Sequence, residues 1–145
     1  MPCKRRRQPI FLTQDARPEP LGIAGFEITV LADQSKTDGY EIFQQSGPAG
    51  TGPSPHSHPW DESFYVISGT VLCGVGEEES LATPGTLIHV PGNTSHWYTF
   101  GEEGGEMVSM TSAGNASEMY EDLARSDTDR SKFGAIAGKH GQEYR

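Results

Sequence analysis

Two histidines and a glutamate lie close together near the middle of the sequence, where their side chains could bind a metal ion. His56, His58 and Glu62 are separated by two and four positions, so each lies an even number of steps from the others. Residues with even spacing project from the same face of an extended strand. If this segment is a strand, both imidazoles and the carboxylate point toward one place, whereas Asp61 points elsewhere. An isolated pair of this kind is more often part of an ordinary loop, so a metal site requires a further ligand.

A second segment supplies that ligand. Residues 85–96 read as a short apolar strand, a turn and a histidine, His96, that begins the next strand. Three imidazoles and one carboxylate suit a divalent first-row transition metal (Fe, Mn, Co, Ni, Cu or Zn), because Mg and Ca prefer oxygen ligands. For His89, in the strand before the turn, we expect a structural role, while an extra ligand or a supporting residue stays open.

The spacing of these residues resembles the two sequence motifs of the cupin superfamily. The first motif is matched at every fixed position, by Gly50, His56, His58, Glu62 and Gly69. The second motif is matched by Gly85, Pro91 and His96. Asn93 stands where the family usually has glycine, a mild departure because asparagine tolerates left-handed backbone. Phe100 stands where the family often has asparagine, which removes a polar group from the pocket and leaves the ligands untouched.

The resemblance is to small, single-domain, metal-binding cupins of the quercetin dioxygenase-like kind. It implies one metal ion (Fe, Mn, Ni, Cu or Zn) held by His56, His58, Glu62 and His96, with Glu62 as the catalytic residue that takes a proton from an aromatic or enolic substrate. Similar cupins act as polyketide cyclases or isomerases with Zn as a Lewis acid, so a redox-neutral reaction is the first alternative. The second alternative is a non-enzymatic small-molecule sensor, because a fold does not fix a function.

Many short strands and closely spaced turns predict an all-β protein, a cupin jelly-roll β-barrel with one short C-terminal helix. An interior glycine, Gly69, predicts a bulge or corner between strands over 64–68 and 70–75. The helix is expected to begin at Asn115, with Glu118 completing a capping box. Its apolar stripe is expected to pack on the outside of the barrel rather than to bind a cofactor, and consists of Met119, Tyr120, Leu123 and Ala124.

Composition divides the chain into an N-terminal arm (1–20), a cupin barrel domain with its helix (21–125) and a C-terminal tail (126–145). The tail is polar with thinly spread apolar residues, so we expect it to be ordered, if at all, by a partner subunit. The basic run over residues 3–7 is interpreted as a solvated arm, because it is short and the chain is acidic.

The predicted substrate pocket is aromatic. Trp60 and Phe64 share the phase of the first ligands, and Tyr98 and Phe100 share the phase of His96. Such walls suit a flat aromatic or polyketide-like substrate. The opposite face of the same strand is also apolar, at Tyr65 and Ile67, and must be covered by the helix or by a second subunit. Cupins of this size are commonly dimers, so the resemblance implies a homodimer.

Charge and composition exclude several other functions. The formal net charge of −9 argues against a nucleic-acid partner. No apolar run is long enough to span a bilayer, so we expect no membrane partner. Cys3 and Cys73 are the two cysteines and are far apart. We expect both to be free thiols of a cytoplasmic protein.

Overall fold

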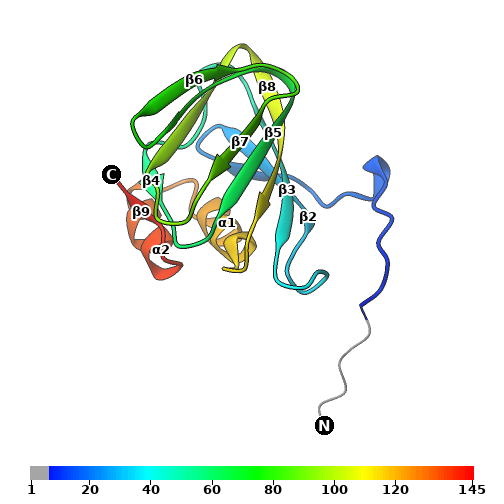
Figure 1. Ribbon diagram of the computed structural model, residues 1–145. Coiled ribbons are helices and arrows are strands. Elements are labelled where there is room, and N and C mark those ends of the chain that lie inside the picture. Colours follow the sequence, from blue (N-terminus) through cyan, green and yellow to red (C-terminus); the bar gives the residue numbers. More distant parts are fainter. Residues whose placement is uncertain (1–6) are drawn as a thin grey trace.

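Alternating apolar and polar residues form strands that curl into a barrel, with helices across one end (Figure 1). The computed structural model describes residues 7–145. Strand order along the main path of the sheet is β1-β2-β3-β8-β4-β9, and β5 joins β6, β7 and β8. The strands are β1 (Leu21–Ile23), β2 (Phe26–Ala32), β3 (Glu41–Gly47), β4 (His56–Ser57), β5 (Glu62–Val75), β6 (Glu78–Ala82), β7 (Leu87–Val90), β8 (His96–Thr111) and β9 (Glu143–Tyr144). The predicted all-β jelly roll is confirmed.

The two long strands, β5 and β8, pair along most of their length and hold the barrel together. The strands predicted on either side of Gly69 form one continuous β5 with register shifts beside that glycine. Gly69 has φ +68°, and a Cβ there would lie 2.1 Å from the Gly104 carbonyl oxygen. Only glycine fits this bend, so the predicted bulge is confirmed. Inward-facing side chains from neighbouring strands, among them Phe43, Val66 and Met107, form the fully buried core.

Two helices, not the single one expected, lie at one end of the barrel. They are α1 (Ala116–Arg125) and α2 (Phe133–Lys139), accompanied by 3-10 turns η1 (Gln14–Ala16) and η2 (Arg130–Lys132). The expected capping box is absent, since Asn115 has φ 57° and makes no side-chain cap. Instead, the backbone N–H of Ser117 donates to buried Glu41 of β3 at 2.9 Å, and its hydroxyl donates to the same carboxylate. A carboxylate from a distant strand thus satisfies the first turn, which no local pattern predicts.

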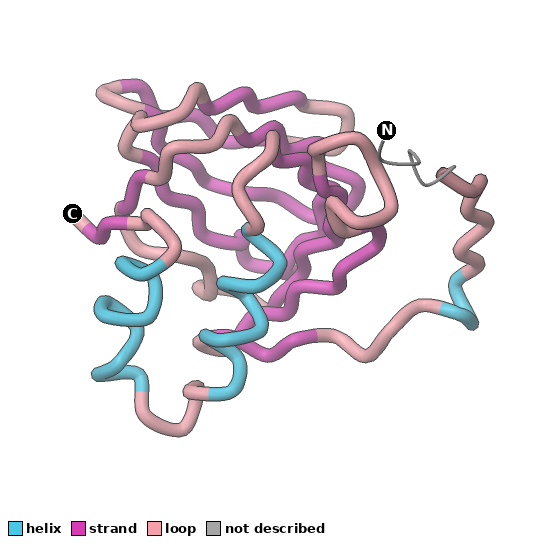
Figure 2. The backbone as a smooth tube through the Cα atoms, turned by 90° about the horizontal axis from the view of Figure 1, so that it is seen from below, coloured by secondary structure: helices cyan, strands magenta, loops and turns pink. Residues whose placement is uncertain are grey.

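The C-terminal segment (residues 126–145) differs from the expected tail, because it folds onto the barrel of its own chain. Helix α2 packs on α1, and β9 pairs with β4 so that Tyr144 lies opposite His56. The backbone N–H of Arg145 donates to the Pro55 carbonyl at 2.8 Å. From below, the two helices lie beside one another across the barrel end (Figure 2). The few apolar residues of this segment are enough to hold it on the barrel, because α2 places Phe133, Ile136 and Ala137 against the core.

Before β1, the chain leads away from the barrel (Figure 1). The expected solvated arm falls partly on residues 3–6, which lie outside the described residues, as does Cys3. Arg7 pairs with Asp38 at 3.0 Å, and both side chains are exposed. Across residues 7–145, neither helix has the length and apolar character needed to cross a membrane.

One outer face of the sheet is apolar and uncovered by the described residues. Its exposed side chains come from β5, β7 and β8 and include Tyr65, Ile67, Leu87 and Met110. The helices close the end of the barrel and do not bury this face, so the first of the two expected covers, the helix, is wrong.

Candidate metal centre

Three buried imidazoles converge inside the barrel. One nitrogen from each of His56, His58 and His96 lies within 4.8 Å of the others. The rings of His56 and His96 are 4.2 Å apart at their centroids, and those of His58 and His96 are 4.7 Å apart. The even-spacing argument and the family motif therefore grouped residues that are neighbours in space.

The physical reason for this grouping differs from the predicted single strand. His56 lies in β4, which pairs with β8 so that His56 stands opposite His96. The strand ends at Ser57, the chain turns through residues 58–61, and β5 begins at Glu62. Strand pairing brings two ligands together, and the turn returns His58 and Glu62 to the same place.

Each imidazole is oriented through its Nδ1 atom by a backbone carbonyl two residues away. His56 donates to Ser54 at 2.7 Å, His58 to Trp60 at 2.9 Å, and His96 to Thr94 at 2.8 Å. A carbonyl can only accept, so the proton resides on Nδ1 and the Nε2 lone pair remains free. Metal-binding histidines are commonly held in this way.

Glu62 is the carboxylate of the cluster and is almost completely buried. Its Oε1 atom lies 3.3 Å from His58 Nε2 and 3.6 Å from His96 Nε2. Burial by itself raises the pKa of Glu62, but the adjacent imidazoles of His58 and His96 outweigh it and lower the pKa to about 2. The carboxylate is therefore ionised at neutral pH.

A divalent transition metal fits the donor set. Burial, with the nearby His96, lowers the pKa of His56 to about 4, so this imidazole is neutral at pH 7, as a ligand must be. The buried Nε2 atom of His96 has no hydrogen-bond partner among the described residues. Such orphaned buried nitrogens are costly unless something binds them. A metal ion bound by the three imidazole nitrogens and the carboxylate would be that partner.

A cavity of about 440 Å³ opens beside this cluster, and His56 and Glu62 face it. Of the four residues predicted to line the pocket, Phe64 and Tyr98 do so, whereas Trp60 and Phe100 do not. Trp60 stacks on the His58 ring at 4.5 Å because the turn after Ser57 breaks the strand phase on which its prediction rested. Phe100 keeps its phase but lies one pleat further along β8, packed behind Tyr98.

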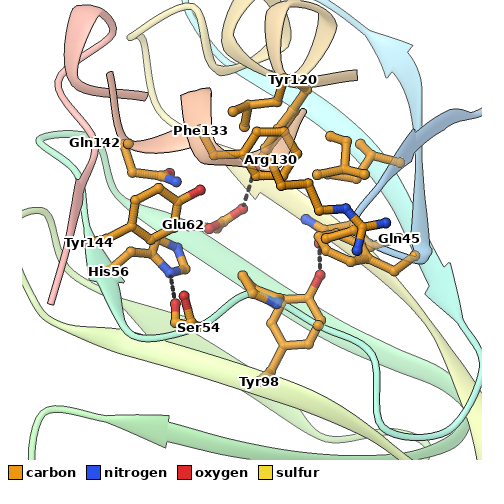
Figure 3. Close-up of a pocket in the computed structure, with 18 of the residues that line it drawn as sticks. Gln45, Ser54, His56, Glu62, Tyr98, Tyr120, Arg130, Phe133, Gln142 and Tyr144 are labelled. Carbon is orange, nitrogen blue, oxygen red and sulfur yellow. Dashed lines mark hydrogen bonds between the residues drawn. The ribbon is translucent and has the colours of Figure 1, made fainter. Parts of the chain in front are cut away.

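The rest of the cavity wall was not predicted. Tyr120 of α1, assigned to the outside of the barrel, instead faces the cavity, and its hydroxyl lies 3.5 Å from Glu62 Oε2 (Figure 3). Burial, with the charge of Glu62, raises the pKa of Tyr98 and of Tyr120 well above the usual value. The C-terminal segment contributes Arg130, Phe133, Gln142 and Tyr144. Among these residues, only Tyr120 belongs to a pattern visible in the sequence, the apolar stripe of α1.

Other candidate residues lie elsewhere. His89 is exposed on the outer face, where its Nδ1 atom lies 2.9 Å from Ser63 Oγ, so it is separate from the cluster. Asp61 points away from the site and accepts the Gly92 N–H at 2.7 Å. Asn93 has φ 62°, the left-handed backbone anticipated from its motif position. Cys73 is a free, buried thiol.

A barrel with clustered histidines inside defines a metal-binding class, and comparison with known proteins gives the family. Residues 43–111 match the family model described as a cupin domain. This match covers just under half of the chain and, with the shared fold, supports the cupin superfamily. The chain matches no curated protein sequence.

Solved structures of similar fold have low sequence identity. An RmlC-like cupin from Shewanella frigidimarina NCIMB 400 is 17% identical, with TM-score 0.68 over 79% of this chain and 99% of that one. KdgF from Halomonas sp. is 19% identical, with TM-score 0.67 over 75% and 99%. Streptomyces Pac13, a nucleoside dehydratase, is 22% identical, with TM-score 0.62 over 76% and 88%. At such identities the likeness shows the fold alone.

Proposed function

We propose that this protein is a metal-dependent enzyme that acts on a small organic substrate. The observation that carries the proposal is the cluster of His56, His58, His96 and Glu62 beside a cavity large enough for such a molecule. A bound Fe, Mn, Ni, Cu or Zn ion would supply Lewis acidity or a site for dioxygen.

Glu62 is the residue proposed to move a proton. It is ionised, buried, and faces the cavity through the side that meets Tyr120. Tyr98 and Tyr120 remain protonated at neutral pH, and Tyr98 donates to Gln45. A carboxylate acceptor and phenolic donors therefore border the same cavity, as general acid–base catalysis requires.

The first candidate reaction is a quercetin dioxygenase-like oxygenation of an aromatic or enolic substrate. It is supported by the three-histidine, one-glutamate set and by the aromatic rings of Phe64, Tyr98 and Phe133 along the cavity.

The second candidate is a redox-neutral reaction by a polyketide cyclase or isomerase type of enzyme, or an elimination. The pairing of ionised Glu62 with protonated phenols favours it, since such reactions need an acid and a base together. Similar structures include a nucleoside dehydratase and DMSP lyases, whose names denote eliminations.

Metal analysis and oxygen uptake distinguish these candidates. Untagged protein should contain close to one equivalent of metal, and oxygen consumption with quercetin or acetylacetone would support an oxygenase. Turnover of an enolic or carbonyl substrate in zinc-loaded protein without oxygen would favour the redox-neutral class. Tight ligand binding without turnover under either condition would favour the sensor.

The expected partner of this enzyme is a second copy of the chain. The exposed apolar face of Tyr65, Ile67, Leu87 and Met110 would be buried in a homodimer. Sedimentation of Leu87→Glu against the wild-type protein tests this, and a wild-type monomer at micromolar concentration would contradict it.

A further inference from the structure

The cavity has one basic side chain among the described residues that line it, and the C-terminal segment supplies it. Arg130 lies at the start of η2. Figure 3 shows its side chain extending over the cavity toward Gln45, with Glu62 and His56 on the other side of the view. The arginine therefore stands at the mouth, apart from the cluster of histidines.

Arg130 is held in place from one side only. Its Nε atom donates to Asp127 Oδ1 at 3.2 Å, and the same oxygen accepts the backbone N–H of Ala24 at 2.8 Å. Asp127 thus ties the C-terminal segment to the turn between β1 and β2. Within residues 7–145, the terminal nitrogens of Arg130 make no hydrogen bond, so the end of the guanidinium remains free.

A free guanidinium end suits one chemical group better than others. Its two terminal NH₂ groups match the two oxygens of a carboxylate, which they bind with parallel hydrogen bonds. A phosphate ester usually draws on several cations or backbone N–H groups, whereas Arg130 is alone in a wall that is mainly apolar. The cavity therefore favours a single carboxylate.

The local charge agrees, although the protein as a whole carries a formal net charge of −9. Glu62 is the only carboxylate among the described cavity-lining residues. With a divalent ion bound, the metal and Arg130 together outweigh that one negative charge. An anionic substrate would then enter a positive cavity on an acidic protein.

We propose that Arg130 is a specificity-determining residue that binds a carboxylate of the substrate, whose opposite end reaches the metal cluster. The inference rests on the proposed metal-dependent function and narrows its substrate class to small organic carboxylates. Because the Arg130 side chain is 55% exposed, salt should weaken this recognition.

The test uses a matched pair of probes, 4-hydroxybenzoate and its neutral amide, 4-hydroxybenzamide. Calorimetry on the metal-containing protein should show that the carboxylate binds roughly tenfold more tightly, and that Arg130→Gln removes this preference. Arg125→Gln is the matched control, because Arg125 also pairs with an aspartate three residues earlier, Asp122, but does not line the cavity. This control should keep the preference.

Two results would overturn the proposal. A preference that survives in Arg130→Gln would mean that the carboxylate binds elsewhere, for instance at the metal. Equal binding of the two probes to the wild type, or no binding of either at millimolar concentration, would mean that the cavity does not select carboxylates. Metal content, measured in the same samples, separates these outcomes from failure of the metal-dependent function, which would appear as wild-type protein that binds no metal.

Discussion

The barrel and the C-terminal segment contribute different parts of one site. All four candidate ligands lie between residues 56 and 96, inside the region that matches the cupin domain. Residues 126–145, outside that region, form one wall of the cavity, here called its roof. The roof includes Arg130, the one arginine or lysine among the described lining residues. A rigid scaffold thus holds the reactive cluster, while an appended segment shapes what can approach it. Metal binding and substrate selection should therefore respond separately to mutation.

The largest effect is expected in the barrel. His56→Ala/His96→Ala should abolish metal binding and activity while the protein stays folded, because the core of Phe43, Val66 and Met107 does not involve the ion. Metal analysis of untagged protein measures this loss. His89→Ala, which changes a histidine on the outer face, should keep full occupancy. A fully loaded double variant would show that the ligands are elsewhere.

The barrel and its candidate ligands were predicted from the sequence far better than the C-terminal segment and its cavity-lining residues. The ligands follow from local spacing and a known motif, both of which survive in the fold even though His56 to Glu62 is not one strand. The same phase argument failed for Trp60, because side-chain alternation does not continue through a turn. Tyr120 and Arg130 reach the cavity only through packing between distant segments, which periodicity does not encode.

The second prediction concerns Phe100, a barrel residue near the site but outside the cavity. It is buried behind Tyr98, so Phe100→Ala should lower the free energy of unfolding by about 3–5 kcal/mol through lost burial and a new void. Denaturant titration measures this change. The folded variant should bind metal and 4-hydroxybenzoate as the wild type does. A specific loss of ligand affinity at unchanged stability would restore Phe100 to the pocket wall.

The third prediction is a pH dependence that originates in the barrel cluster. The pKa of His56 is about 4 in the folded protein and 6.5 when unfolded, so between these values the unfolded chain holds the extra proton. Stability of the metal-free protein should be constant above pH 6.5 and fall by about 3 kcal/mol as the pH approaches 4. The Glu62 contribution is present above pH 4.5 and is lost as the pH falls through about 2.

Denaturant titrations of chelated protein between pH 7.5 and 4 measure this slope, and His56→Gln should flatten it. Protonation of the unbound His56 also opposes metal binding, so the melting shift caused by metal should fade as the pH falls through about 4. A metal-dependent shift that stays constant well below pH 4 would contradict ligation by His56.

The smallest expected effect concerns the C-terminal segment. It distinguishes the contribution of this segment to ligand binding from its contribution to stability. Phe133 and Ile136 lie one turn apart on α2 and both pack on the core, but only Phe133 lines the cavity. Phe133→Ala should weaken binding of 4-hydroxybenzoate by about 1–2 kcal/mol, roughly tenfold, because part of the ring's apolar contact with the ligand is lost. Ile136→Ala removes comparable packing from the same helix, so it should lower the melting temperature and leave the affinity unchanged. Metal content should be unaffected in both. Equal loss of affinity in the two variants would mean that α2 acts on binding only by holding the fold, and the division between a reactive barrel and a selective roof would fail.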